Sequence, residues 1–342
     1  MKLASLWPLL APLAVADYKG DDEWPALTKA LDEYPAFHAK ELKKIKNGDA
    51  SARWLVLTAY HGLGNRERAM MSGFAFALVN RLAFFVEFDT AGCDKEADKG
   101  NVKCQPADLQ NMYKGHGFDW RALTKCLPRH GRTKPKPTDV CLHPGYKKVK
   151  GGVVDLRVQS EEKLIRRGVA AIGPRVLMHS DHTLLKYIVC DKAVRKSGLF
   201  PPDFFAAQRQ IEAFLLQPRG DVRDRAQAAL KRAGGCAVGL HLRGPGAGHH
   251  RDAGVFLDDL APALAAAPGG LFVLGDGNNE QKKKDIVKQA RRRGMNVVDV
   301  EGSGQKGGLM SALAENLVFS SCAMLVPTVR SSFFSIAAVR AA

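Results

Sequence analysis

The sequence has 342 residues, of which 46% are hydrophobic, and its formal net charge is +16. This length suffices for two domains with hydrophobic cores, because a single core stops growing at about 250–300 residues, and the apolar content excludes disorder as the default state. The basic residues are not interleaved with aromatic side chains, so we expect no nucleic-acid-binding surface. The charge either attracts an anionic ligand, such as a nucleotide-sugar or an acidic glycan, or reflects only solvated faces.

The N-terminus has the pattern of a secretory signal. Lys2 gives a positive start, Leu3–Ala14 is mostly apolar, and Ala14-Val15-Ala16 fits the small-x-small cleavage pattern. We expect residues 1–16 to be a signal peptide or a signal anchor, since the apolar run is shorter than the roughly 20 residues that span a bilayer. The rest of the chain is expected in the lumen of the Golgi or secretory pathway, touching a membrane only through this segment if it stays uncleaved.

Seven cysteines in a chain routed to an oxidising compartment predict disulfides. Four of them lie close together in the first half, and we expect pairing chiefly among these. None stands in a Cys-x-x-Cys spacing, so no structural zinc site is expected. The seven are Cys93, Cys104, Cys126, Cys141, Cys190, Cys236 and Cys322.

The first half, residues 17–220, begins with a helical segment and a strand, turn, helix, strand unit of the parallel-sheet type. A polar segment at 89–152, with cysteine, lysine, glycine and proline, is expected to be an irregular insertion. The expected elements are helices over Trp24–Lys46, Glu67–Leu82 and Asp203–Leu216, and strands at Trp54–Ala59, Ala83–Phe88 and Arg175–Ser180.

The second half, residues 221–342, alternates strands with helices of 10–15 residues, which predicts a doubly wound parallel sheet. Ligands in such sheets bind beyond the carboxyl ends of the strands, so residues just after each strand are candidates for function. The expected strands are Ala237–Leu242, Leu271–Leu274, Val297–Val300 and Ala323–Pro327, and the expected helices are Val255–Ala266, Asn279–Arg293 and Leu309–Val318.

A glycine turn, Gly62-Leu63-Gly64-Asn65-Arg66, follows the first strand. Gly62 and Gly64 let backbone amides approach an anion, the helix start adds its positive dipole end, and Asn65 and Arg66 offer donors. The alternative is an ordinary tight turn. On the first interpretation, Gly62, Gly64, Asn65 and Arg66 belong to a candidate anion site.

The strand ending at Leu242 is followed by Arg243 and a Gly-Pro-Gly turn. Arg243 would project its planar guanidinium beyond the sheet, where a bidentate contact with a pyrophosphate can form, with His241 beside it. The alternative is a surface salt bridge next to a core histidine. Asp276 follows the next strand, where a carboxylate either accepts hydrogen bonds from a nucleoside or caps a helix.

A serine-rich helix start, Ser331-Ser332-Phe333-Phe334-Ser335, follows the last strand. Hydroxyls and amides at such a position form a second anion cradle, or serve as a plain N-cap. We include Ser331, Ser332 and Phe333 in the candidate site.

These motifs together resemble the plant-type α-1,2-fucosyltransferases of cell-wall xyloglucan, and more distantly the α-1,6- and protein O-fucosyltransferases. The resemblance covers about residues 50 to 340 and depends on the order and separation of the motifs. Beyond the turn at 62–66, the matching segments are Pro174 to His182, Leu199-Phe200-Pro201, Leu216-Gln217-Pro218, Ala312 to Leu317 and Ser331 to Ala337.

The resemblance implies two Rossmann-like lobes of the GT-B kind and transfer of fucose from GDP-fucose with inversion, without a cofactor and without a required metal. It implies that Arg243 binds the pyrophosphate and stabilises the leaving GDP, and that Asp276 holds the nucleoside. A sequence lacking an Asp-x-Asp pair fits metal-free action. Compared with the family, the chain ends inside the expected last helix. The general base stays unassigned among Asp252, His249 and His250.

Two other functions fit the same sequence. The chain could use a different GDP-sugar with the same lobes, or it could be a noncatalytic glycan- or nucleotide-binding protein of the secretory pathway. The expected partners are a GDP-sugar donor and a glycan or polysaccharide acceptor.

Overall fold

A computed structural model of the chain describes residues 24–59, 63–88, 112–114, 117–120, 153–157, 173–180, 184–242, 253–275, 280–300, 308–327 and 336–337. Its contacts divide the chain into two compact units. Of the described residues, the first unit takes those within 17–220 and 305–313, and the second those within 221–304 and 314–342. Each unit is built around a parallel sheet, which confirms the α/β fold class.

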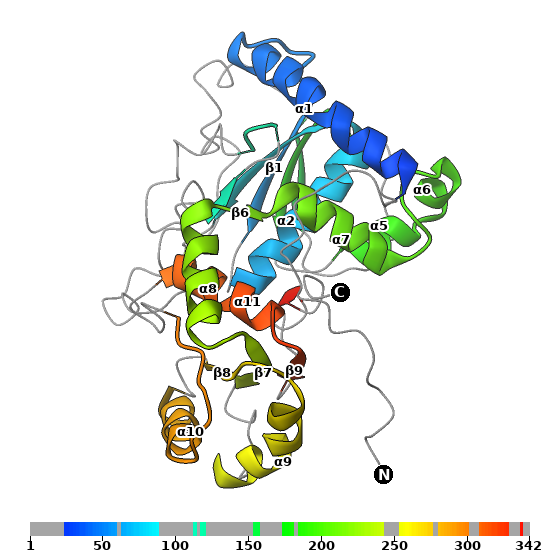
Figure 1. The fold of residues 1–342 in the computed structure, drawn as a ribbon. Helices are drawn as coiled ribbons and strands as arrows, with labels where there is room; N and C mark the ends of the chain where they lie inside the picture. Colours follow the sequence, from blue (N-terminus) through cyan, green and yellow to red (C-terminus); the bar gives the residue numbers. More distant parts are fainter. Residues whose placement is uncertain are drawn as a thin grey trace. The chain divides into compact units, whose positions relative to one another are not determined.

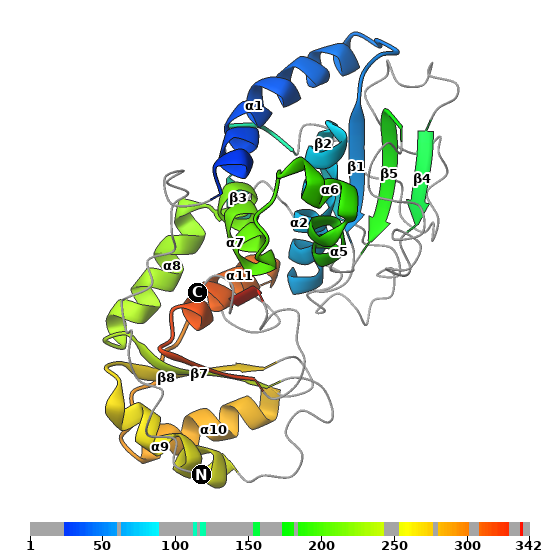
Figure 2. The ribbon, with the colours of Figure 1, turned by 90° about the vertical axis from the view of Figure 1, so that its right-hand side faces the viewer.

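The first unit contains a four-stranded parallel sheet in the order β2-β1-β5-β4 (Figure 2). Three of these strands match the sequence predictions, whereas β4 was not predicted. The strands are β1 (Trp54–Ala59), β2 (Ala83–Phe88), β4 (Val153–Arg157) and β5 (Arg175–Ser180).

Two long helices pack against this sheet. α2 (Leu63–Asn80) contacts β1 and β2, and it comes so close that a Cβ on Gly73 would lie 3.0 Å from the Phe84 ring. The end of α1 (Pro25–Lys46) forms a separate core cluster with Trp54 and Phe85. Because almost every residue of α2 is buried, the helix shows no polar face.

α1, at the top of Figure 1, also contacts β2, the strand at the edge of the sheet in Figure 2. The Tyr34 hydroxyl donates to the Leu82 carbonyl and accepts from the Phe84 amide, both at 2.8 Å. His38 Nε2 lies 3.2 Å from the Phe84 carbonyl, and since a carbonyl only accepts, this nitrogen carries the proton. Side chains thus satisfy backbone groups that an unpaired edge strand would leave exposed.

Burial controls the protonation of both groups at this edge. It lowers the pKa of His38 to about 4, although the Phe84 hydrogen bond and the charge of Asp119 act in the opposite direction. It raises the pKa of Tyr34 well above the usual value. His38 is therefore neutral and Tyr34 protonated at neutral pH.

The first unit also contains three shorter helices and a short two-stranded antiparallel sheet. Asp203 caps α7 through the amides of Phe205 and Ala206, which confirms the helix predicted there. α5 and α6 were not predicted. The elements are α5 (Leu185–Cys190), α6 (Lys192–Ser197), α7 (Phe204–Leu215), β3 (Tyr113–Lys114) and β6 (Gln217–Pro218), with β3 antiparallel to β6.

The second unit contains a three-stranded parallel sheet in the order β8-β7-β9. Its alternating elements agree with the sequence predictions to within a few residues, except that α8 was not predicted. They are α8 (Gly220–Arg232), β7 (Cys236–Leu242), α9 (Ala253–Ala266), β8 (Gly270–Gly275), α10 (Glu280–Arg292), α11 (Gly308–Ser320) and β9 (Met324–Pro327). Gly220 and the start of α11, up to residue 313, group with the first unit.

The strand predicted at Val297–Val300 is wrong. Val297 forms only an isolated parallel bridge with Leu271, in which the Leu271 amide donates to the Asn296 carbonyl and the Val298 amide donates to the Leu271 carbonyl. Val298 and Val300 are buried but make no ladder. Their apolar alternation reflects packing at the sheet margin, which sequence periodicity does not distinguish from a strand.

Helices cover both faces of this second sheet. Val238, Leu240 and Leu242 form one core cluster with α9 and α10, whereas Gly239 faces Phe319 of α11. The prediction of a doubly wound sheet is thereby confirmed. Within the described ranges, no helix is long and apolar enough to cross a membrane.

Candidate functional site

The order of strands in the second unit identifies one position at its carboxyl edge. The Val297 bridge lies beside β8, β8 beside β7, and β7 beside β9. The chain therefore moves outward in one direction from β7 and then returns to add β9 on the other side. Such a reversal is the topological switch point at which open α/β sheets bind ligands.

His241 lies on this edge, one residue before the end of β7. It pairs with Leu274 of β8 on one side and with Pro327 of β9 on the other, so the three carboxyl ends are aligned. Its side chain is buried, and its ring lies 5.9 Å from the Phe319 ring. The imidazole therefore packs against α11.

Gly239 makes this packing possible. A Cβ there would lie 2.5 Å from Phe319 Cδ2 and 3.0 Å from Cys322 Sγ, which is closer than side chains approach one another. Only glycine lets α11 lie this close to β7. The close approach brings the Phe319 ring into contact with the His241 ring. A glycine inside a buried strand run is the sequence signal of such an approach, and Gly239 is not among the predicted site residues.

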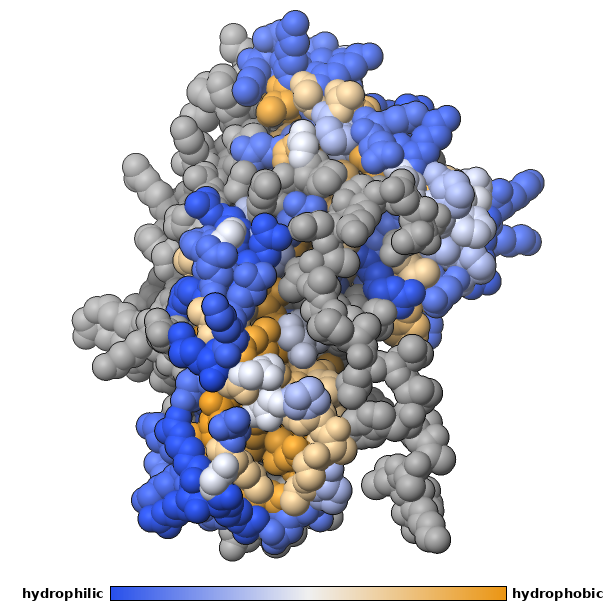
Figure 3. Space-filling model, in the orientation of Figure 1, coloured by the Kyte–Doolittle hydropathy of each residue, from blue (hydrophilic) through white to orange (hydrophobic). Residues whose placement is uncertain are grey.

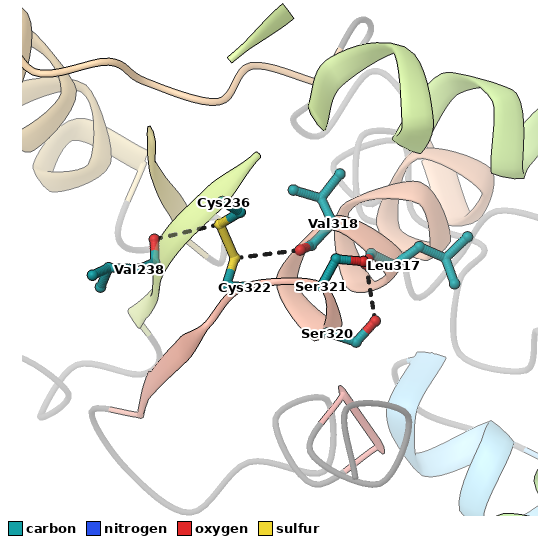
Figure 4. Close-up of a disulfide and its surroundings, with 7 residues drawn as sticks. All are labelled: Cys236, Val238, Leu317, Val318, Ser320, Ser321 and Cys322. Carbon is teal, nitrogen blue, oxygen red and sulfur yellow. Dashed lines mark hydrogen bonds between the residues drawn. A yellow bond between two sulfur atoms is a disulfide. The ribbon is translucent and has the colours of Figure 1, made fainter. Parts of the chain in front are cut away.

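A disulfide joins Cys236 at the start of β7 to Cys322 just after α11 (Figure 4). The two Cα atoms are 4.5 Å apart, and 86 positions separate the cysteines in sequence. The hydroxyls of Ser320 and Ser321 donate to the Leu317 carbonyl and close the end of α11. The bond fixes the amino end of β7 against the helix that supports its carboxyl end.

The cysteines expected to pair lie elsewhere in the chain. Cys93, Cys104, Cys126 and Cys141 are outside the described residues, and Cys190 is an exposed free cysteine. A disulfide is therefore present, as predicted, but between two cysteines that sequence spacing did not single out.

The turn predicted before a helix at Glu67 is wrong for residues 63–66, which already belong to α2. The helix begins at Leu63, so Gly64, Asn65 and Arg66 form its first turn, where backbone amides lack helical partners. Asn65 is half-buried and Arg66 fully buried. The neighbouring Glu67 accepts a hydrogen bond from the Tyr113 hydroxyl, which ties this turn to β3.

The other predicted site residues lie outside the described residues. Arg243 directly follows β7 and Asp276 directly follows β8, whereas the serine-rich segment starts four residues after β9. The residues concerned are Gly62, Arg243, Asp276, Ser331, Ser332 and Phe333, and the base candidates Asp252, His249 and His250.

No protein-family model matches the chain, and no curated protein matches it in sequence. Its fold is similar to that of solved fucosyltransferases. An arginine-to-lysine mutant of Arabidopsis thaliana FUT1 in complex with GDP superimposes with a TM-score of 0.62 at 14% sequence identity, covering 92% of this chain and 77% of that chain.

Two structures of the fucosyltransferase NodZ have lower TM-scores. NodZ α-1,6-fucosyltransferase co-crystallised with GDP gives a TM-score of 0.48 at 17% identity, covering 84% of this chain and 91% of its own. NodZ from Bradyrhizobium gives 0.47 at 16%, covering 84% and 92%. These two values are too low to support a structural argument. The FUT1 likeness shows the fold, and it confirms the predicted GT-B-like architecture.

Proposed function

We propose that this protein transfers fucose from GDP-fucose to a galactose-containing glycan or cell-wall polysaccharide, as the plant-type α-1,2-fucosyltransferases of xyloglucan do. The observation that carries the proposal is the switch point beside β7, with His241 at the strand end and Arg243 two residues further along the chain. The FUT1 neighbour, which shares the fold, contains GDP. A nucleoside diphosphate suits this position, because open α/β sheets bind ligands at the switch point and Arg243 after β7 can pair with phosphates.

Arg243 is the proposed catalytic residue. In fucose transfer, negative charge develops on the departing diphosphate, and a preorganised guanidinium lowers the barrier by binding that charge more strongly in the transition state. Asp276 is proposed to accept hydrogen bonds from the nucleoside. The hydroxyls and amides of Ser331, Ser332 and Phe333 are proposed to close on the phosphates.

The support behind Arg243 comes from described residues. Gly239, Phe319 and the Cys236–Cys322 disulfide hold β7 firmly against α11. A rigid strand end costs little reorganisation when the donor binds, which is the condition for electrostatic catalysis. His241 would act as a positioning residue, because it packs on Phe319 and precedes the arginine by two positions.

A second anion-binding position is proposed at the start of α2, within the first unit. The amides of Gly64 and Asn65 lie in the first helical turn, where the positive end of the helix dipole favours a phosphate or a developing oxyanion. Gly62 and Arg66 are proposed to belong to the same anion-binding position. Arg66 is proposed to act from its buried position, by orienting the turn.

Inversion at the anomeric carbon and independence of a metal are part of the proposal. With a guanidinium and backbone amides balancing the diphosphate charge, activity is expected to survive a chelator. The general base that deprotonates the acceptor hydroxyl is not assigned. The secretory lumen is the proposed location, and a disulfide supports an oxidising compartment.

The decisive experiment compares donor binding and transfer in the wild type and in Arg243→Ala. GDP and GDP-fucose should raise the melting temperature of the wild type, while UDP should not. The variant should lose transfer to a galactose-containing acceptor by a factor of about a hundred to a thousand, the range for loss of a charge-stabilising group. NMR of the product reports the anomeric configuration.

Arg195→Ala, at an exposed position on α6, is the matched control and should retain activity. Guanine-selective stabilisation without any transfer would indicate a noncatalytic nucleotide-binding protein. Stabilisation by another GDP-sugar in preference to GDP-fucose would replace the donor. Unchanged transfer in Arg243→Ala would contradict the assignment of that residue.

A further inference from the structure

α10 presents a row of cations on the face opposite its buried side. Lys284, Lys288 and Arg292 are exposed and stand four residues apart, so they line up along one stripe of the helix. Ile286 and Ala290, on the other side, are buried in the core of the second unit. With a rise of about 1.5 Å per residue, neighbouring cations of the row are about 6 Å apart and the whole row is about 12 Å long.

The acidic residues near the row already have ion-pair or hydrogen-bond partners. Asp299 pairs with Arg291, Asp258 pairs with Arg293 at 2.6 Å, and Glu315 pairs with Lys283 at 3.5 Å. Asp285, on α10 itself, accepts a hydrogen bond from Gln281. No ion pair among the described residues involves Lys284, Lys288 or Arg292, so the row keeps a positive field at the surface.

A shallow hollow accompanies the row. It has a volume of about 470 Å³ and is lined by the row together with Val287 and Arg291. The aliphatic stems of lysine and arginine form apolar walls below their charged ends. The surface over α10, at the lower left of the space-filling view, is strongly hydrophilic (Figure 3). The surface thus offers spaced cations above a small apolar floor.

We propose that this face of α10 is a docking strip for a linear acidic polysaccharide. A chain of uronate or sulfated sugars carries anions at regular intervals, which can pair with a row of evenly spaced cations. Its sugar rings also have C–H faces that can pack on the lysine and arginine stems in the hollow. The net charge of +16 would add long-range attraction for such a polymer.

Other polyanions fit this surface less well. A membrane-binding helix needs an exposed apolar face beside its cations, but the apolar residues of α10 face the core, apart from half-buried Val287. Single-stranded nucleic acid needs aromatic side chains on which bases stack, and α10 has none. The strip needs no donor nucleotide, so the proposal stands independently of the transfer reaction.

The test measures binding of a size-defined oligogalacturonide to the full chain by isothermal titration. The triple variant Lys284→Gln, Lys288→Gln, Arg292→Gln should weaken binding about tenfold or more, because paired charges of a linear polyanion release its counterions. Wild-type affinity should fall with added salt, and the variant should show a smaller salt dependence. GDP binding should be unchanged in the variant, which separates this proposal from the proposed transfer activity.

The control removes the same number of charges from an exposed helical surface elsewhere. Lys40, Lys43 and Lys46 of α1 are exposed, and their replacement by glutamine should leave oligogalacturonide binding within about twofold. An equal loss in both triple variants would show attraction by net charge alone and would overturn the strip. Tighter binding to phosphatidylserine vesicles or to oligothymidylate, or equal binding to a neutral maltooligosaccharide, would also overturn it.

Discussion

The two parallel sheets of this protein are secured by different means. In the first unit, side chains of α1 satisfy the backbone at the edge of β2 through several ordinary hydrogen bonds. In the second unit, the Cys236–Cys322 disulfide and the close packing of Phe319 on Gly239 hold β7 against α11. The three-stranded sheet thus has a covalent constraint in addition to its hydrophobic core with α9 and α10.

The difference has a functional side. The proposed diphosphate site lies at the end of β7, so the strand that must stay fixed is the one held by the stronger constraints. Three of the four tryptophans, Trp24, Trp54 and Trp120, belong to the first unit, so tryptophan fluorescence follows chiefly that unit, and hydrogen exchange of β7 peptides follows the second. These two readouts allow each unit to be perturbed and observed separately.

The largest expected effect comes from removing the disulfide. Cys236→Ser with Cys322→Ser should lower the unfolding free energy of the second unit by about 4 kcal/mol, as loop entropy predicts for a bond closing a long loop. Hydrogen exchange of β7 under mild denaturant measures it, and tryptophan fluorescence should change little. Cys190→Ser is the control and should have no effect. A loss below about 1 kcal/mol would show that noncovalent packing alone holds β7.

Acidification should weaken the first unit through His38. Its pKa is lowered to about 4 in the folded protein, against 6.5 when exposed, so between these pH values the unfolded state binds a proton that the folded state does not. Stability present above pH 6.5 is therefore lost as pH falls to 4, by up to about 3 kcal/mol. Urea unfolding followed by tryptophan fluorescence measures this slope.

His38→Gln supplies the comparison for this pH effect. The glutamine amide can still donate to the Phe84 carbonyl but does not titrate. Its stability curve should be flatter between pH 4 and 6.5. The same slope in both proteins would assign the acid sensitivity to other groups.

Gly239→Ala should destabilise the second unit by about 2–3 kcal/mol, because the new methyl group would overlap the Phe319 ring. Replacing the ring with a smaller side chain, in the double variant Gly239→Ala with Phe319→Leu, should recover part of the lost stability. Gly220→Ala, where a Cβ would meet nothing within 4 Å, is the control. Hydrogen exchange of β7 provides the measurement, and equal exchange rates in the two alanine variants would mean that α11 can move away at little cost.

Tyr34→Phe should have the smallest effect, about 1–2 kcal/mol in the first unit. The change leaves the Leu82 carbonyl and the Phe84 amide without their side-chain partner while preserving ring contacts with Phe74 and Phe118. Tyr34→Leu removes those ring contacts as well and should cost clearly more. If both variants unfold at the same urea concentration, the aromatic contacts contribute nothing measurable.

Sequence patterns predicted most elements of this protein because those patterns are local. The apolar run at 54–59, the alternation of strands and helices after residue 236 and the Asp203 cap each follow from neighbouring residues. Short helices such as α5 and α6 escaped prediction because six residues give too little periodicity. The candidate site followed from strand ends, whose alignment at His241 the structure confirms.

The sequence by itself therefore determined the α/β class and the parallel second sheet, and it predicts the edge at which a ligand would bind. Only the tertiary structure decided that Cys236 pairs with Cys322, that Gly239 admits Phe319, that Tyr34 caps β2, and that Val297 contributes a bridge instead of a strand. Most of these partners lie tens of residues apart in the chain. Their meeting depends on the free energy of packing the whole unit, and no local periodicity or residue spacing encodes it.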